Sequence, residues 1–201
     1  MAKQDKLAEY RRKRDFHLTS EPSGNKKIDG RKKNQFVIQK HDASSLHYDL
    51  RLQVDDVFVS WAVPKGPSTD PSEKRLAIRT EDHPLQYGNF EGVIDEGNYG
   101  AGTVMIWDRG RFTNLREEKE EDGASMEASL DEGKIEVWLE GEKLQGGYVL
   151  IRTQQGEQEQ WLLKKMDDDK ADARRNPVST QPNSVVSGRS LDAIQKEASP
   201  S

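Results

Sequence analysis

Gln39-Lys40-His41-Asp42-Ala43-Ser44-Ser45-Leu46-His47-Tyr48-Asp49-Leu50-Arg51 is the stretch on which the fold prediction depends. From His47 onward polar and apolar residues alternate, which indicates a half-buried β-strand. Such a strand presents His47, Asp49 and Arg51 on one face and the intervening apolar residues on the other. If residues 42–45 turn the chain, His41 returns beside His47. Two imidazoles and one carboxylate then converge, with a guanidinium one step farther along the strand.

The same alternation recurs through the central part of the chain. Strands are expected over 36–41, 47–54, 57–63, 75–80, 103–108, 127–130, 134–139, 147–153 and 160–165. Short connections at 55–56, 131–133 and 154–156 are typical of hairpins. Successive strands with tight turns and no crossover helix predict a mainly β protein, a small antiparallel β-barrel with short peripheral helices and disordered termini. One tryptophan falls in each of four strands and is expected in the core: Trp61, Trp107, Trp138 and Trp161.

Three regions are expected along the 201 residues. Residues 1–33 form a basic, partly flexible segment with a short helix near residues 7–16, 34–170 the barrel, and 171–201 a disordered tail or linker. Residues 1–40 carry twelve Lys/Arg and five Asp/Glu, whereas residues 115–143 carry four and eleven. A basic arm on an acidic body suggests a polyanionic partner, although a solvated charged surface is the simpler interpretation.

The composition excludes several classes of site. The sequence has no cysteine, which excludes disulfides, a cysteine nucleophile and thiolate-ligated zinc or iron–sulfur centres. Any transition metal must therefore be held by histidine and oxygen ligands. Because the chain shows neither an apolar run of membrane-spanning length nor a signal-peptide core, we expect a cytoplasmic protein without a membrane partner.

The spacing of histidine and aspartate predicts a metal site. His47 and Asp49 share one strand face with their Cα atoms about 7 Å apart, so both side chains can lean onto one ion. A lone histidine is normally an ordinary hydrogen-bonded residue. Here three of the four histidines stand among charged and aromatic neighbours. We therefore expect His41, His47 and Asp49 to bind a metal, and imidazole plus carboxylate suits manganese, iron, zinc or cobalt better than magnesium or calcium.

Basic residues near the same strand point to phosphate. The planar fork of Arg51 matches phosphate oxygens and stays charged at any working pH. Lys65 and Arg75 bracket the Pro-Gly-Pro loop after the next strand, so both are expected to reach the same barrel mouth. The imidazole of His83 is suited to hydrogen-bond a phosphate or to protonate a leaving oxygen, with Tyr87 nearby. A well-packed loop is the alternative reading of these last two residues.

Several segments also share the pattern of a known family. The stretch from Phe36 to Arg51 resembles the signature of the 3′-phosphoesterase module of bacterial DNA ligase D, and the similarity spans roughly residues 10–165. Residues 184–189 resemble the joint that leads into the ligase domain of the fused enzyme. The other matching segments are Lys13-Arg14-Asp15-Phe16, Thr19-x-Glu21-Pro22, Ser60-Trp61-Ala62-Val63-Pro64-Lys65-Gly66-Pro67, Glu81-Asp82-His83-Pro84-Leu85-Gln86-Tyr87 and Glu91-Gly92-Val93-Ile94 with Gly97-x-Tyr99-Gly100.

The resemblance implies a hydrolase of DNA repair by non-homologous end joining. Such an enzyme depends on Mn²⁺, with Co²⁺ or Zn²⁺ as alternatives. It removes a 3′-terminal ribonucleoside as a phosphodiesterase and then the remaining 3′-phosphate as a phosphomonoesterase. The implied partners are primer–template DNA 3′ ends, ligase and polymerase domains and the end-binding protein Ku. A monomer that joins the nucleoid during repair is expected.

The resemblance also assigns residues. With Arg51 and His83 on the phosphate, it implies that Tyr87, Glu21, Asp15 and Arg14 complete the site as the N-terminal segment folds across the barrel mouth. Gln39 is expected to contact phosphate or DNA, and Lys65 and Arg75 to matter most for the doubly charged monoester. The remaining basic residues of the arm are expected to grip the DNA backbone: Lys26, Lys27, Arg31, Lys32 and Lys33.

Two other functions are compatible with the residue pattern. His-x-Asp with a distant histidine is also the facial triad of non-haem iron oxygenases, in which His83 competes with His41 as third ligand. Arg51 beside the metal favours phosphate over an oxo-acid cosubstrate. A DNA-end-binding module whose metal is structural or absent is the non-catalytic alternative.

Overall fold

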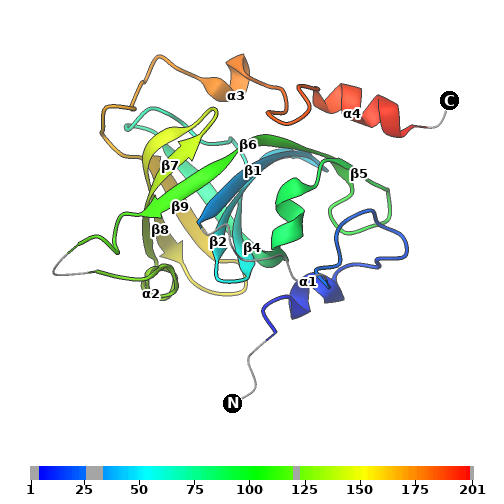
Figure 1. The fold of residues 1–201 in the computed structure, drawn as a ribbon, viewed down its shortest axis with the longest axis horizontal. Coiled ribbons are helices and arrows are strands. Elements are labelled where there is room, and N and C mark those ends of the chain that lie inside the picture. Colours follow the sequence, from blue (N-terminus) through cyan, green and yellow to red (C-terminus); the bar gives the residue numbers. More distant parts are fainter. Residues whose placement is uncertain (1–4, 26–33, 120–122, 200–201) are drawn as a thin grey trace.

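An eight-stranded antiparallel barrel forms the body of the protein (Figure 1). The computed structural model describes residues 5–25, 34–119 and 123–199. Neighbouring strands follow the order β1-β2-β3-β4-β9-β8-β7-β6, and β6 pairs back with β1 to close the barrel, while β5 extends β6 at the edge. The mainly β fold with short helices is thus confirmed. The strands are β1 Gln35–Asp42, β2 Leu46–Val54, β3 Val57–Val63, β4 Lys74–Pro84, β5 Gly92–Ile94, β6 Gly102–Asn114, β7 Lys134–Gly141, β8 Gln145–Gln154 and β9 Gln160–Lys165.

Strand alternation fills the barrel interior with apolar side chains. On β2 the core residues are Tyr48, Leu50, Leu52 and Val54, as the period-2 pattern predicts. Trp61, Trp107 and Trp161 are each at most 1% exposed and pack in this core, as expected. Trp138 is only partly buried, so the core prediction is wrong for that residue.

The helices are short and lie outside the barrel: α1 Ala8–Arg12, the 3₁₀ helix η1 Leu85–Asn89, α2 Met126–Glu132, α3 Pro177–Thr180 and α4 Leu191–Ala198. Residues 127–130 were expected as a strand, and the structure corrects this because they belong to α2. The Ser125 side chain caps this helix by accepting a hydrogen bond from Ala128 N, and Gly133 ends it with φ of 79°. These local capping signals outweigh the short apolar run.

Strand β4 is longer than the sequence predicts and carries site residues with it. The expected strand ended at residue 80, yet β4 continues to Pro84, and His83 pairs with Phe58 across an irregularity in the register. The following expected loop contains η1 and β5. A β-bulge of this kind re-aims side chains, which is why regular alternation did not place Glu81 and His83.

The tail after residue 170 is a strap on the barrel, contrary to the expected disordered linker. Ile194 of α4 is 3% exposed and joins the core cluster. Trp107 Nε1 donates to Gln181 O (2.9 Å), and Val185 N donates to Ile106 O (3.0 Å). These bonds join residues far apart in the sequence and use backbone acceptors. The polar composition of the tail therefore gave no sign of them.

Glu91 holds the C-terminal tail against β6. Its carboxylate accepts hydrogen bonds from Ser184 Oγ (2.6 Å), Ser187 Oγ and Arg189 Nη2 (3.1 Å). It also accepts one from Ile106 N of β6 (3.0 Å). Burial alone would raise the pKa of Glu91, but these donors hold it below the usual value.

The basic residues expected to grip DNA, from Lys26 to Lys33, lie outside the described residues. Among the described residues, no helix combines the length and the apolar character needed to cross a membrane.

Candidate metal and phosphate site

Two neighbouring strands bring His41, His47 and Asp49 together. His41 of β1 and His47 of β2 are direct partners in the antiparallel register, and Asp49 follows two residues later on the same face. One ligand atom from each residue lies within 4.8 Å of the others, close enough for one metal ion. The convergence expected from the sequence is therefore present.

Each imidazole is oriented by a backbone carbonyl. His41 Nε2–H donates to Gly100 O (2.8 Å), and His47 Nδ1–H donates to Ser45 O (2.8 Å). The remaining ring nitrogens face Asp49, with His41 Nδ1 3.6 Å from Oδ2 and His47 Nε2 3.5 Å from Oδ1. A backbone carbonyl that accepts from the far ring nitrogen is the arrangement that fixes metal-binding histidines. Two nitrogens and one carboxylate thus fit a divalent transition metal.

The charge of Asp49 is maintained by its neighbours. Burial alone would raise the pKa of this carboxyl, but the Arg51 guanidinium and hydrogen bonds from both imidazoles hold it well below its usual range. Burial lowers the pKa of His47, and Asp49 more than compensates and raises it. Asp49 is therefore a carboxylate anion beside both imidazoles.

Arg51 is held rigidly beside this cluster. It is 2% exposed, and Nε donates to Gln39 Oε1 (2.7 Å) while Nη1 donates to Ser60 Oγ (2.9 Å). Nη2 lies 3.3 Å from Asp49 Oδ2. The guanidinium also stacks over the Tyr87 ring at 4.7 Å. An arginine fixed on several sides presents its remaining N–H groups in one direction.

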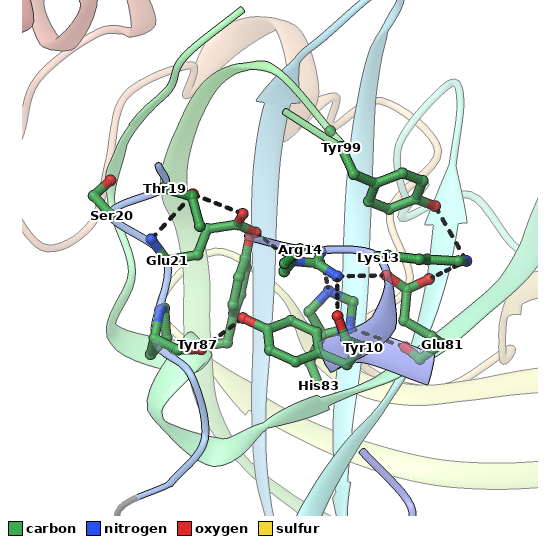
Figure 2. A network of polar contacts seen from close by, with 12 residues as sticks. Tyr10, Lys13, Arg14, Thr19, Ser20, Glu21, Glu81, His83, Tyr87 and Tyr99 are labelled. Atoms are coloured by element: carbon green, nitrogen blue, oxygen red, sulfur yellow. Dashed lines mark hydrogen bonds and ion pairs between the residues drawn. The ribbon is translucent and has the colours of Figure 1, made fainter. Parts of the chain in front are cut away.

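The N-terminal segment covers the site through Arg14 (Figure 2). Arg14 Nε donates to Glu21 Oε1 (2.9 Å), and Nη1 donates to Glu81 Oε1 (3.0 Å). Tyr87 OH donates to the same Glu21 oxygen (2.9 Å). The guanidinium lies over the Tyr10 ring at 4.0 Å. These contacts bind residues 10–21 to β4 and η1.

His83 completes the group on β4. Its Nδ1–H donates to Glu81 O (2.9 Å), so Nε2, 3.5 Å from Arg14 Nη2, carries no proton in the neutral ring. Burial, reinforced by the Arg51 and Arg14 charges, holds the pKa of His83 well below its usual value. Its imidazole is therefore neutral at pH 7 while the site is free of an anion.

A cavity of about 250 Å³ connects these groups. This volume is below the roughly 300–1,000 Å³ of sites that bury drug-sized ligands, and it matches a phosphate group better than a whole nucleotide. His47, Asp49 and Arg51 point away from the core residues of β2, so the cavity lies on the outer face of the barrel. The expected position across the barrel mouth is corrected accordingly. Its lining comprises Arg14, His41, Ala43, His47, Asp49, Arg51, Ala62, Thr80, Glu81, His83, Tyr87, Ile94, Tyr99 and Gly100.

Five residues expected at the site do not line this cavity. Lys65 is exposed, and Arg75 Nη2 pairs with Glu73 Oε2 at 2.6 Å. Asp15 is exposed and accepts a hydrogen bond from His17 N (3.0 Å). Gln39 is fully buried behind Arg51. Glu21 does not line it either, but reaches it through Arg14 and Tyr87.

Sequence reasoning gave no role to several residues that the structure adds. Glu81 is 7% exposed and receives both Arg14 and Lys13 (Nζ–Oε2 3.0 Å). Burial would raise its pKa, but Arg14 and Lys13 lower it. Ser60 and Tyr99 were also missed. Glu81 and His83 stand two residues apart on β4, beyond the residue at which the expected strand ended, so regular alternation gave no position for Glu81.

Comparisons with known proteins show which family the chain resembles. Residues 39–152 match the family described as DNA Ligase D 3'-phosphoesterase domain. The chain is 49% identical over 189 residues to the Multifunctional non-homologous end joining protein LigD of Pseudomonas aeruginosa, covering 92% of this chain and 22% of that protein. It is 44% identical over 166 residues to the Multifunctional non-homologous end joining DNA repair protein LigD of Mycobacterium tuberculosis, with coverages of 83% and 20%. The chain thus spans about a fifth of the length of these relatives.

Proposed function

The chain belongs to the DNA ligase D 3′-phosphoesterase domain family, and on this basis we propose that it hydrolyses phosphate esters at DNA 3′ ends during non-homologous end joining. The observation that carries the proposal is the convergence of His41, His47 and Asp49 beside the immobilised Arg51. Family membership favours this activity over an iron oxygenase or a purely DNA-binding module.

The three converging residues are proposed to hold Mn²⁺, with Co²⁺ or Zn²⁺ as alternatives. When bound, such an ion polarises a phosphate oxygen and lowers the pKa of a coordinated water. Gly100 O and Ser45 O hold the two imidazoles with their free nitrogens toward Asp49. The ligand set is therefore preorganised, and little reorganisation accompanies metal binding.

Arg51 and His83 are proposed to bind the phosphate. Arg51 offsets the negative charge that builds in the transition state. The approach of a phosphate anion raises the pKa of a nearby imidazole, so His83 can take up a proton and donate it toward an ester oxygen. Arg14, Tyr87 and Glu21 hold the N-terminal segment over the phosphate and limit the access of bulk water.

The proposed reaction has two steps. First, water adds to phosphorus of the last phosphodiester, the bond to the 5′ oxygen of the terminal ribonucleoside breaks, and that oxygen takes up a proton. A second hydrolysis then releases inorganic phosphate and leaves a 3′-hydroxyl. Lys65 and Arg75 stand outside the cavity as described, so a contribution to the monoester step requires that they act at longer range or after a rearrangement. Asp15 is proposed to act through the conformation of the N-terminal segment.

The proposed partners are primer–template DNA ends that carry a terminal ribonucleotide or a 3′-phosphate. From the family resemblance we also propose work alongside ligase and polymerase domains, with Ku as an end-binding partner. We propose that the protein is a monomer that works in the cytoplasm, at the nucleoid during repair.

Asp49→Ala tests the site assignment. It removes the carboxylate shared by both imidazoles, so we expect loss of both activities and of Mn²⁺ binding measured by electron paramagnetic resonance. Asp131→Ala, an exposed aspartate on α2, serves as the matched control and is expected to keep both. An Asp49→Ala protein that cleaves at the wild-type rate in Mn²⁺ would show that the metal site lies elsewhere.

A further inference from the structure

A second groove adjoins the phosphate cavity at Tyr99. Thr80, Glu81 and Tyr99 line both spaces, so the two are separated by a single layer of side chains. The groove has a volume of about 550 Å³, within the range of sites that bind small organic molecules. Its walls come from α1, β4 and the turn between β8 and β9. A substituent on a phosphate in the cavity can therefore extend into this groove.

Tyr99 offers an aromatic surface at this junction. The side chain is 47% exposed, which is unusual beside the other tyrosines of the chain, each of which is at most 3% exposed. Lys13 Nζ and Arg14 Cζ lie 4.9 Å and 5.3 Å from the ring centroid, and Lys13 Nζ is 3.4 Å from the hydroxyl (Figure 2). The cations fix the ring while leaving much of it accessible.

The position of Tyr99 is also coupled to the metal ligands. The adjacent Gly100, with φ of 74°, places its carbonyl on His41 Nε2 (2.8 Å). A φ in this region favours glycine, so the turn is defined by its sequence. The turn that orients His41 therefore sets the distance between the exposed ring and the phosphate cavity.

The charge of the groove restricts what it accepts. Five carboxylates and three cations line it, and Lys13 and Arg79 are already paired with Glu81 and Asp82. Glu157 has no ion-pair partner in the described part of the chain. Continuing DNA would bring further phosphates against these carboxylates and be repelled, whereas a nucleoside is neutral. Carboxylates also accept hydrogen bonds from ribose hydroxyls.

We propose that this groove receives the terminal nucleoside that the diesterase step releases, with Tyr99 as the surface on which its base stacks. The inference rests on the proposed function, since it requires a scissile phosphate in the adjacent cavity. It explains why such an enzyme would remove one nucleoside from the end and not a longer fragment. Base–aromatic stacking tolerates every base, so no sequence preference follows.

The test compares primers that end in adenosine and in an abasic ribose, each joined by the same phosphodiester. For the wild-type protein we expect kcat/KM for nucleoside release to be about 5- to 150-fold higher with the base present, the worth of one stacked base. Tyr99→Leu should remove this difference, and Tyr99→Phe should retain it. Leu76→Ala, at an exposed apolar residue of β4 outside the groove, is the control for surface substitution.

The ratio of kcat/KM for the adenosine primer to that for the abasic primer is measured within one protein. A substitution that lowers both values equally therefore leaves the ratio unchanged. A second primer carries a 3′-phosphate on the terminal ribonucleoside, and the acidic groove should slow its release relative to the 3′-hydroxyl form. Two results would overturn the subsite alone. One is an equal kcat/KM for the adenosine and abasic primers in the wild-type protein. The other is a Tyr99→Leu protein with the same ratio between these primers as the wild type. No nucleoside release from any primer would overturn the subsite and the proposed function together.

Discussion

Gln39 links Arg51 to the 3₁₀ helix η1 and to Phe90, which follows it. The residue is 0% exposed, and its Oε1 accepts from Arg51 Nε at 2.7 Å. Its Nε2 donates to Tyr87 O (2.8 Å) and Phe90 O (2.9 Å). The sequence indicated a direct contact with phosphate or DNA, whereas the structure uses every polar group of the side chain internally. We therefore propose that Gln39 positions Arg51.

Gln39→Met keeps the volume of the side chain but removes all three hydrogen bonds. A lost bond to a charged donor costs about 1.5–3 kcal/mol and a neutral one about 0.5–1.5 kcal/mol. The free energy of unfolding should therefore fall by about 2.5–6 kcal/mol, a large part of the roughly 5–15 kcal/mol of a typical domain. Because Arg51 loses a fixed partner, kcat/KM should fall about 10- to 100-fold. Losses of this size follow when a residue that orients a metal ligand is replaced.

Urea denaturation measures the first effect and end-processing kinetics the second. Gln145→Met is the matched control, since that glutamine is exposed and makes one long bond, from Nε2 to Gly141 O at 3.4 Å. The reasoning is refuted if Gln39→Met unfolds at the same urea concentration as the control, because three buried polar groups would then have been left unpaired without penalty.

Three further predictions concern the framework. Asp108 accepts backbone hydrogen bonds from residues 142–144, so Asp108→Ala should lower the free energy of unfolding by about 2–5 kcal/mol in urea titrations. Burial lowers the pKa of Lys143 to about 8 from its ordinary 10.5. The unfolded chain then binds more protons between these pH values, stability should rise from pH 8 toward 10.5, and Lys143→Met should flatten that rise in thermal melts. Glu91→Ala should speed amide hydrogen exchange over residues 184–198 without changing exchange in the barrel. Equal acceleration in the tail and in the barrel would contradict a specific role of Glu91 in holding the tail.

The hairpin that carries the candidate metal ligands was predictable because its information is local. Alternation places Asp49 and His47 on one face, and a short turn returns His41 to their side. Nothing farther along the chain is needed for that convergence. The same reasoning gave most of the barrel strands, since each strand contributes a regular apolar face.

The contacts that cover the site depended on long-range geometry instead. Arg14 meets Glu81 across 67 residues, and the irregular pairing of β4 with β3 decides which side of the strand Glu81 and His83 occupy. Periodicity places Lys65 and Arg75 after β3 but does not say that the cavity lies on the outer face. A single sequence carries no signal for such pairings between distant side chains.

The central claim is a metal-dependent attack on the 3′-terminal phosphate, and one reaction examines it directly. A primer–template ending in one ribonucleotide is incubated with Mn²⁺, with Mg²⁺ or with chelator, and the products are resolved on a gel over time. The account predicts loss of one nucleoside to leave a 3′-phosphate, then loss of that phosphate, with Mn²⁺ and not with chelator. An untouched primer under every metal, or processing that persists in chelator, would contradict it.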